Sequence, residues 1–367
     1  MKPSVLHSIH EELGAHFVAL GDRSIPAHYG DHAAEHLAVR KTAGIADISH
    51  RGMLQVTGDD RVTWLQSIVS QDLRPLQPGK GCYSAFMSAK GKILSCFRVY
   101  LQPEAVLVED VGEVGDQTFQ AFRKFLLYGT KAKIKSLLES WGILLVSGPL
   151  ASKILEDSFS ISVKSLAPLC FVSFEIDGQY ALVARTEETG EEDFELFASQ
   201  EVLPSAWKRI SAVGTPFGLR PFGSEARESL RLEAGIPRLG PDLNDQIVPP
   251  EANLEGKAFS LSKGCYPGQE VVARMDTYGS VKRRLVGLTV QAPAGTVLSP
   301  GTKVFRGDRE VGWISSAGFS PSLNQLIALA FPLRDFTAPE TELEVEREGR
   351  RYPSTVHSLP FLTSLPS

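Results

Sequence analysis

The sequence is organised around the stretch Lys263-Gly264-Cys265-Tyr266-Pro267-Gly268-Gln269-Glu270. Its glycines permit backbone conformations that other residues resist, and its proline interrupts any regular strand or helix. We therefore expect a sharply bent loop that presents Cys265 to a ligand or to another segment of backbone. The apolar run at 271–273 indicates that a buried element follows and anchors this loop.

Cys265 could act as a nucleophile or a ligand only as its thiolate, and the pKa of a free thiol is about 8.5. The positive charge of Lys263 would lower this pKa, whereas the negative charge of Glu270 would raise it. The sequence alone does not say which of the two charges lies closer to the thiol, so it fixes neither a raised nor a lowered pKa for Cys265. A second interpretation is that Cys265 is a small buried apolar residue and that the glycines only mark a turn.

The composition is that of a globular protein. The 367 residues carry 38 basic and 43 acidic side chains, a net charge of −5, and 43% of the residues are hydrophobic. This balance argues against a general nucleic-acid surface, which needs clustered lysine and arginine. No apolar run approaches the ~18 residues that cross a bilayer, and the N-terminus shows no secretory signal. We expect a soluble, cytoplasmic monomer of two or three domains.

The cysteines and histidines are the candidate metal ligands of the chain. The four cysteines are widely separated and match neither a zinc-binding pair nor a disulfide framework, so we expect reduced thiols at Cys82, Cys96, Cys170 and Cys265. Three histidines occur at intervals of four residues, which is metal-ligand spacing, at His28, His32 and His36. They lack the further ligand pattern of a known zinc helix, so we expect no metal site.

Up to about residue 278 the chain alternates short strands with helices. The apolar periodicity predicts helices over 31–42, 58–69, 116–127, 149–156 and 224–234, and strands over 53–57, 82–87, 93–101, 105–109, 143–147, 170–174, 180–184 and 194–197. Several of these strands are joined as hairpins, for example through Asp177-Gly178. The pattern predicts α+β modules with mixed or antiparallel sheets. No glycine-rich phosphate-binding motif is present, so a nucleotide site is not supported.

The character of the chain changes after Arg284. Short strands separated by glycine and proline turns are predicted over 285–290, 303–305, 310–315, 325–331, 342–346 and 354–357. Because there is almost no helical pattern between them, we predict a small β-barrel. We place the boundary near 278–282, which divides the chain into a region of residues 1–278 and a barrel of residues 282–362.

The helix predicted over 224–234 carries Arg227 and Arg231 one turn apart on one face. Two like charges at this spacing are mildly unfavourable on a solvated helix. Either an anionic ligand or a neighbouring acidic side chain would explain them.

Three motifs together resemble one known family: ARESLRLEAGIP at 226–237, PEANL at 250–254 and KGCYPGQE at 263–270. They are similar to the folate-binding YgfZ family, which is related to the glycine cleavage T-protein, an aminomethyltransferase. The similarity covers nearly the whole chain, and the KGCY loop indicates the YgfZ branch. The resemblance implies an α+β fold, with two ferredoxin-like modules that form a folate-binding region and a C-terminal small β-barrel.

The resemblance also implies a site for tetrahydrofolate. Glu195 is similar to the family's glutamate that contacts the pterin, and a carboxylate can accept two N–H bonds from the 2-aminopyrimidinone edge. Arg227 resembles a folate-site arginine, and Tyr83 offers a ring that could stack on the pterin. The alternative for Glu195 is a surface acid on an edge strand.

One departure from the T-protein pattern concerns catalysis. Where the T-protein has paired aspartates, one of them catalytic, this chain has Ser95 and Cys96. Neither side chain can act as a carboxylate near neutral pH. The departure argues against aminomethyl transfer and leaves open whether the protein is an enzyme.

The leading hypothesis is therefore a tetrahydrofolate-binding accessory protein that assists assembly or repair of iron–sulfur clusters in client enzymes, with a link to tRNA modification. In it, Cys265 is the functional thiol, Lys263 tunes this thiol, and Gln269 with Glu270 shape the loop or touch the ligand. One cysteine cannot supply the usual four thiolate ligands of a cluster, so the hypothesis does not include a cluster bound to this loop. The alternatives are a folate-dependent aminomethyltransferase or other one-carbon transferase, and a non-catalytic interaction scaffold. The expected partners are folate and iron–sulfur enzymes, without a membrane or general nucleic-acid surface.

Overall fold

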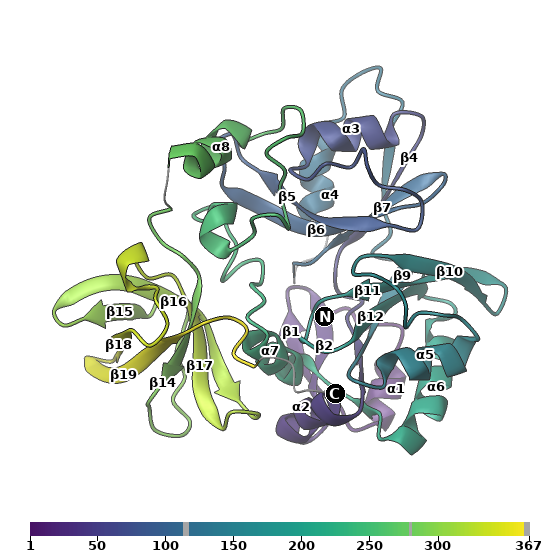
Figure 1. Cartoon of the computed structure of the whole chain (residues 1–367). Coiled ribbons are helices and arrows are strands. Elements are labelled where there is room, and N and C mark those ends of the chain that lie inside the picture. The colour runs from purple at the N-terminus through teal and green to yellow at the C-terminus, as the bar shows by residue number, and fades with distance from the viewer. Residues whose placement is uncertain (113–116, 279–280, 363–367) are drawn as a thin grey trace.

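The computed structural model describes residues 1–112, 117–278 and 281–362 (Figure 1). Two large sheets, each with its own helices, and a small two-stranded sheet formed by β1 (His16–Leu20) and β2 (Arg23–His28) precede a closed barrel. The predicted fold class, an α+β region followed by a small β-barrel, is confirmed. Among the described residues, no helix has the length and apolarity needed to cross a bilayer.

A five-stranded antiparallel sheet in the order β5-β6-β7-β4-β8 forms the upper part of Figure 1. Its strands are β4 (Met53–Thr57), β5 (Gly81–Met87), β6 (Ile93–Leu101), β7 (Ala105–Asp110) and β8 (Lys133–Ser136). Helices α3 (Arg61–Ile68) and α4 (Gln117–Arg123) pack on it around the buried ring of Phe122, which meets Phe97 edge-on at 5.4 Å. Aromatic packing thus holds the helices on this sheet.

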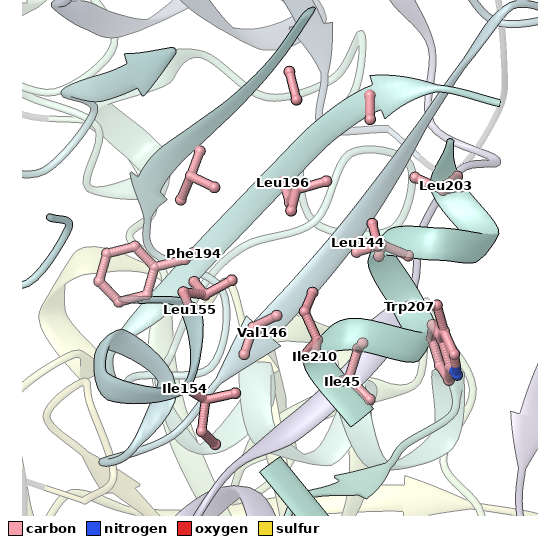
Figure 2. Packing of buried hydrophobic residues seen from close by; sticks show 14 of the residues in the cluster. Ile45, Leu144, Val146, Ile154, Leu155, Phe194, Leu196, Leu203, Trp207 and Ile210 are labelled. Atoms are coloured by element: carbon pink, nitrogen blue, oxygen red, sulfur yellow. The ribbon is translucent and has the colours of Figure 1, made fainter. Parts of the chain in front are cut away.

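A six-stranded sheet in the order β10-β11-β12-β9-β3-β13 lies below it. Its strands are β3 (Gly44–Asp47), β9 (Trp141–Ser147), β10 (Phe171–Ile176), β11 (Gln179–Thr186), β12 (Asp193–Ser199) and β13 (Arg220–Pro221). Helices α5 (Ala151–Phe159) and α6 (Leu203–Gly214) cover one face, with Trp207 packed near Leu144 (Figure 2). Since β3 precedes β4–β8 and β9 follows them, the five-stranded unit is an insertion in the six-stranded one.

The other face of the six-stranded sheet packs against the five-stranded sheet. Tyr100 of β6 is buried there, with its ring 5.9 Å from Phe171 and 5.6 Å from Phe197. The shared core fixes the two sheets relative to each other, and polar side chains at its edge face the site described below.

The remaining elements of this region surround the sheets. They are α1 (His7–Glu12), β1 (His16–Leu20), β2 (Arg23–His28), α2 (His32–Lys41), η1 (Thr215–Phe217), α7 (Ser224–Glu233), η2 (Pro249–Ala252) and α8 (Gln269–Tyr278). Helix α2 begins as predicted, because the Asp31 carboxylate accepts from the amides of Ala33 and Ala34 at 3.0 and 3.2 Å. Helix α7 lies near the centre of the molecule, beside the barrel (Figure 1).

The C-terminal strands close into a barrel in the order β14-β17-β16-β15-β18-β19. Its elements are β14 (Val286–Val290), β15 (Lys303–Arg306), β16 (Arg309–Ser320), β17 (Gln325–Ala330), η3 (Arg334–Phe336), β18 (Glu342–Arg347) and β19 (Arg350–His357). All six predicted strands are present, and β16 and β19 are longer than expected. The boundary at 278–282 includes residues outside the described ones, so the division into 1–278 and 282–362 remains a prediction.

Several elements differ from the sequence-based prediction. The helix predicted over 116–127 starts outside the described residues and ends at Arg123, after which the amides of Lys124 and Phe125 make tight-turn bonds to carbonyls three residues back. The helix predicted over 149–156 corresponds to α5, which covers Ala151–Phe159 and so ends three residues later than predicted. The next residue, Ser160, adopts the left-handed conformation with φ 55°. The buried element expected at 271–273 is helix α8, with Val272 fully buried.

Candidate functional site

A cavity of about 560 Å³ lies where the two sheets, α7 and the segment before the barrel meet. This volume is typical of a site for a small molecule. Tyr83 of β5, Arg98 of β6 and Arg227 of α7 line it together with residues of the barrel side such as Leu285. Its charged lining residues are Arg51, Arg98, Glu187, Glu188, Arg227, Glu228, Arg231, Arg238 and Lys257.

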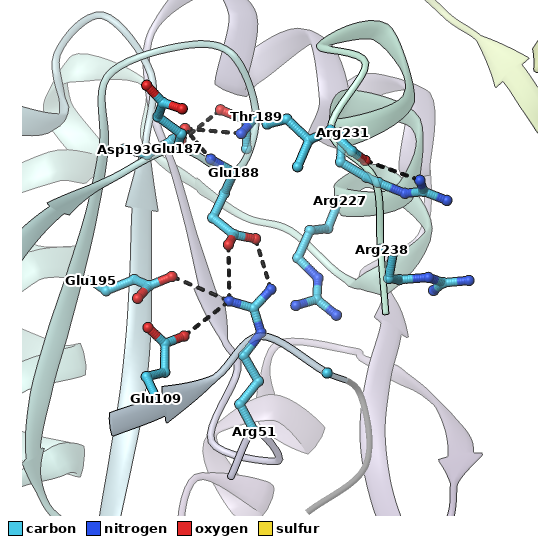
Figure 3. Close-up of polar contacts among 12 residues, drawn as sticks. Arg51, Glu109, Glu187, Glu188, Thr189, Asp193, Glu195, Arg227, Arg231 and Arg238 are labelled. Atoms are coloured by element: carbon cyan, nitrogen blue, oxygen red, sulfur yellow. Dashed lines mark hydrogen bonds and ion pairs between the residues drawn. The ribbon is translucent and has the colours of Figure 1, made fainter. Parts of the chain in front are cut away.

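Five buried charged side chains form a cluster at one wall of the cavity: Arg51, Arg98, Glu109, Glu188 and Glu195 (Figure 3 shows all but Arg98 by label). Arg51 binds Glu188 through both terminal nitrogens, at 3.0 and 2.7 Å. One nitrogen of Arg98 lies 2.8 Å from Glu195 and 3.0 Å from Glu109. The side chains are at most 9% exposed, so these contacts are shielded from solvent.

The cluster contains more carboxyl groups than guanidinium groups. Burial raises the pKa of Glu195 well above its ordinary value, and the nearby Arg98 only partly opposes this effect. Burial would also raise the pKa of Glu188, but Arg51 and Arg98 lower it overall. Burial thus favours the neutral form of Glu195, whereas the two arginines favour the carboxylate form of Glu188.

A polar turn between β11 and β12 fixes the position of Glu188. The buried carboxylate of Asp193 accepts from the amides of Glu188 and Thr189 at 2.8 and 2.9 Å. It also accepts from the Thr189 hydroxyl at 2.6 Å. With its backbone held from one side and its carboxylate from the other, Glu188 has a defined place at the cavity wall.

Glu195, predicted to contact the pterin, lies in β12 between β11 and β9 and is fully buried. The alternative of a surface acid on an edge strand is therefore wrong. Its Oε1 accepts from Arg98 at 2.8 Å and from Arg51 at 3.2 Å. It is not among the lining residues of the cavity, and its contact with a pterin stays a prediction.

The two arginines of α7 have different surroundings. Arg227 lines the cavity, with a terminal nitrogen 3.5 Å from Nε2 of His50. Arg231 also reaches the cavity wall, but it is paired with Asp242 at 2.7 Å and with Glu228. For Arg231 the interpretation as a partner of neighbouring acids is correct.

Tyr83 lines the cavity, its hydroxyl lies against the thiol of Cys96, and its stacking on a pterin stays a prediction. Burial raises the pKa of Cys96 to about 12, so this thiol stays protonated at neutral pH. Ser95 faces the other way and is hydrogen-bonded to Thr118. Thr118 in turn donates to Asp110, whose pKa is raised to about 6 by burial. Asp110 is the carboxyl group beside the position where the T-protein pattern has its aspartates.

The Lys263 ammonium does not point toward open solvent. It is buried and donates to the carbonyls of Gln66 at 2.6 Å and Gln71 at 3.2 Å, and it lies 5.1 Å from the ring centre of Tyr266. Burial lowers the pKa of Lys263 to about 8. Lys263 thus fastens the loop to the end of α3. Cys265 itself is exposed, which contradicts the interpretation of it as a buried apolar residue, and its tuning by Lys263 stays a prediction.

Gly268 explains the bend of this loop. Its φ is 84°, and a Cβ there would lie 2.6 Å from the Ser88 carbonyl oxygen and 2.8 Å from Cα of Gly91. The close backbone approach expected for Gly268 is therefore observed. Gly264, in contrast, faces open space.

Gln269 and Glu270 begin helix α8. The Gln269 amide donates to the Lys263 carbonyl at 3.1 Å and so helps to shape the loop, while Glu270 is exposed. No residue of 263–270 lines the cavity. The structure therefore separates two features that the sequence placed in one site, and ligand contact by Gln269 and Glu270 stays a prediction.

Sequence reasoning missed most of the buried charge cluster. Arg51, Arg98, Glu109 and Glu188 were not predicted as site residues. A signal was present for two of them, because Arg98 and Glu109 are charged positions within otherwise apolar strands. Arg51 and Glu188 lie in turns and gave no such signal.

The histidine series does not form one site. His36 is fully buried, with Nδ1 2.7 Å from the Ser229 hydroxyl and Nε2 3.2 Å from Glu233. His32 is about half exposed. Across the described parts of the chain, no group of three or more His, Cys, Asp or Glu side chains is arranged to hold a metal ion.

Comparisons with known proteins cover nearly the whole chain. The family model described as GCVT N-terminal domain matches residues 6–261, and the model described as glycine cleavage T-protein C-terminal barrel domain matches residues 283–362. An aminomethyltransferase of Corynebacterium aurimucosum is 32% identical, covering 98% of this chain and 97% of the relative. An aminomethyltransferase of Moorella thermoacetica is 31% identical, covering 98% of both.

A solved structure shows the same architecture. The crystal structure of glycine cleavage system aminomethyltransferase T from Bartonella henselae superposes with a TM-score of 0.88 at 25% sequence identity. The match covers 99% of this chain and 98% of the other. These matches support the T-protein part of the resemblance, and the assignment to the YgfZ branch stays a prediction.

Proposed function

Because this chain belongs to the glycine cleavage T-protein family, whose members bind tetrahydrofolate, we propose that it binds a tetrahydrofolate in the cavity and acts as a one-carbon transferase. The observation that carries this proposal is the cavity of about 560 Å³, whose wall combines a carboxylate, an aromatic ring and several cations. The nearly full-length similarity to aminomethyltransferases supports the transferase role over the accessory role.

The lining residues fit the parts of a folate. A pterin presents N–H donors, which a buried carboxylate such as Glu188 can accept, and Tyr83 offers a ring for stacking. Arg238 and Lys257 are 34% and 67% exposed and pair only loosely with acids, at 3.4 and 3.8 Å. Cations of this kind suit the carboxylates of the glutamate tail.

The one-carbon unit would come from an aminomethyl donor: two nitrogen atoms of tetrahydrofolate form bonds to its methylene carbon and each loses a proton, while the bonds from this carbon to its amine and to its carrier break and both leaving groups take up a proton. Neither side chain at 95 and 96 is a carboxylate: Ser95 carries a hydroxyl and Cys96 a buried thiol. The pKa of this thiol is raised to about 12, so it is not an anion at neutral pH either. Of the three glutamates that line the cavity, Glu187, Glu188 and Glu228, the buried one is Glu188, whose charged form is favoured by Arg51 and Arg98.

The test is anaerobic transfer from such donors to tetrahydrofolate, followed by detection of one-carbon-substituted folate. Wild type is expected to form the product, and Arg227→Ala, at the cavity wall, to lose at least tenfold in rate. Glu270→Ala, which is exposed and outside the cavity, is the matched control and should retain wild-type rate. Binding of tetrahydrofolate without any transfer would overturn the transferase role.

One observation favours the accessory role as a second candidate. Cys265 is exposed on a loop that Lys263 and Gly268 fix in place, so a partner protein could reach its thiol. In a strain that lacks the gene, Cys265→Ala is then expected to fail to restore the activity of iron–sulfur enzymes and of tRNA modification that depends on them. Cys170→Ala, which changes a thiol elsewhere, is the control. Full restoration by Cys265→Ala would exclude a role for the thiol.

A further inference from the structure

A basic loop with an apolar tip lies beside the five-stranded sheet, away from the cavity. It covers residues 124–132 and joins α4 to β8. None of the residues that line the cavity comes from the stretch 117–138. The loop therefore lies outside the site of the proposed function, and an inference about it does not depend on that function.

The stretch 117–138 is strongly basic, although the whole chain carries a net charge of −5. It has no acidic residue and five cations, which are Arg123, Lys124, Lys131, Lys133 and Lys135. All five side chains are exposed. Among the described residues, their one ion pair joins Lys131 to Asp59 at 3.8 Å, with the two side chains 72% and 83% exposed. An exposed pair at this distance leaves most of the positive charge available to a partner.

The tip of the loop exposes apolar side chains. Leu127 is 75% exposed and Tyr128 is fully exposed, and the turn continues through Gly129 with a φ of 89°. Phe125 adds a partly exposed ring. A single exposed apolar residue is common on protein surfaces, but three of them on one basic loop form a small patch that a partner can cover.

The base of the loop is held in place on both sides of the tip. The ring of Phe125 packs edge-on against Phe86, with the ring centres 5.2 Å apart, and its carbonyl accepts from Nε1 of Trp64 at 3.0 Å. After the tip, the amide of Lys131 donates to the carboxylate of Asp60 at 2.7 Å. The base is thus ordered before a partner binds, which reduces the conformational entropy that binding costs.

An anionic lipid surface fits this combination of a protruding apolar tip and flanking cations. Leucine and tyrosine side chains enter the boundary between headgroups and acyl chains, and lysines are attracted to anionic headgroups. Nucleic acid would pair with the cations but offers no apolar medium for Leu127. A folded acidic protein would need a groove that matches the tip, whereas a bilayer accepts a protruding tip of any shape.

We propose that this loop binds the surface of membranes rich in anionic lipids, with Leu127 and Tyr128 inserted among the headgroups and the five cations facing them. The binding is weak and reversible, because two inserted side chains and five cations make one small anchor. The expectation of no membrane partner rests on the absence of an apolar run long enough to span a bilayer, and surface binding needs no such run.

Sedimentation of the full chain with vesicles at physiological salt tests the proposal. Pure phosphatidylcholine is compared with a mixture of two parts phosphatidylcholine and one part phosphatidylglycerol. Each lysine near an anionic surface contributes about fivefold in affinity, so wild type should bind the mixed vesicles at least about tenfold more tightly than the neutral ones. On the mixed vesicles, the double variant Lys124→Gln, Lys131→Gln should lose about 10- to 30-fold, and Leu127→Ser, Tyr128→Ser should lose about tenfold.

Matched controls change an exposed lysine and an exposed apolar residue elsewhere. Lys208→Gln in α6 and Val297→Ser, at a side chain 67% exposed before β15, should bind the mixed vesicles as wild type does. Tyr128→Trp supplies an independent readout, because its emission should move to shorter wavelength with the mixed vesicles and stay constant with the neutral ones. All of these side chains are exposed, so the variants are expected to fold.

Two results would overturn the proposal directly: wild type that does not sediment with the mixed vesicles, or tip and lysine variants that bind as tightly as the two controls. Binding to polyglutamate but not to the vesicles would assign the loop to an acidic protein instead. Binding to RNA but not to the vesicles, unchanged by Leu127→Ser, would assign it to nucleic acid.

Discussion

The wall of the cavity and the Cys265 loop both hold polar side chains in fixed positions, but different interactions hold them in the two regions. At the wall, guanidinium and carboxyl groups hold one another at 2.7–3.2 Å, away from solvent. In the loop, backbone carbonyls hold Lys263 and a glycine allows close approach, while the thiol stays exposed. The wall is therefore suited to a small ligand that replaces water, and the loop to contact with another macromolecule.

The largest effect is expected from the wall. Arg98→Met would leave Glu109 and Glu195 buried without their main cation, which costs about 3 to 5 kcal/mol of unfolding free energy. Arg209→Met is the control, because Arg209 pairs with Asp177 at an exposed site and should cost less than about 1 kcal/mol. Urea unfolding measures both values, and equal costs would show that the cluster is not the tightly coupled unit described here.

A smaller, pH-dependent effect is expected beside the wall at Asp110. Burial raises the pKa of this carboxyl to about 6 from 3.8, so the folded state retains its proton where the unfolded state loses it. Stability contributed by Asp110 is thus present below pH 4 and lost as the pH rises to 6. Relative to wild type, Asp110→Asn should gain about 2 to 3 kcal/mol of unfolding free energy over that interval. A constant difference between pH 4 and 6 would contradict the raised pKa.

In the loop, we expect the close contact between the backbone of Gly268 and the turn at 88–91 to contribute to the stability of the protein. Gly268→Ala places a methyl group against the Ser88 carbonyl at a φ of 84°, and should cost about 1 to 3 kcal/mol. Gly264→Ala has no atom within 4 Å of the added carbon and should cost less than about 0.5 kcal/mol. Thermal unfolding of the two variants separates these outcomes, and similar stabilities would mean that the loop does not rest on the 88–91 turn.

The smallest effect is expected at the thiol itself. Cys265→Ser should change the unfolding free energy by less than about 0.5 kcal/mol, because the side chain is exposed. It should also leave the affinity for tetrahydrofolate unchanged, because residue 265 is outside the cavity lining. A clear loss of affinity for tetrahydrofolate in Cys265→Ser would show that the cavity and the Cys265 loop belong to one binding site.

Local patterns were sufficient to predict the fold class and most elements. Strand β4 was predicted with its bounds, and the Asp177-Gly178 turn joins β10 to β11 with φ of 51° and 77°. The edge strand β8 was missed because its exposed Lys133 and Lys135 leave only a weak apolar pattern. Lysines on an edge strand oppose pairing with a further strand, but they also remove the apolar pattern by which a strand is predicted from sequence.

The site was predictable only in part, because the positions of its side chains depend on contacts between segments that are far apart in the sequence. Arg227 and Tyr83, which were predicted to contact folate, line the cavity, and the contact itself stays a prediction. Glu195 was predicted as a ligand contact, yet its partners Arg51 and Arg98 come from turns and strands about a hundred or more positions away. Which of two glutamates reaches the cavity depends on the packing of the two sheets, and no local pattern encodes that.

Anaerobic calorimetric titration of the wild-type protein tests most directly whether the cavity binds tetrahydrofolate. We expect saturable binding of one ligand per chain, weakened at least tenfold by Arg227→Ala and unaffected by Cys265→Ser. Absence of binding at millimolar tetrahydrofolate would contradict it and would favour an interaction scaffold with this fold.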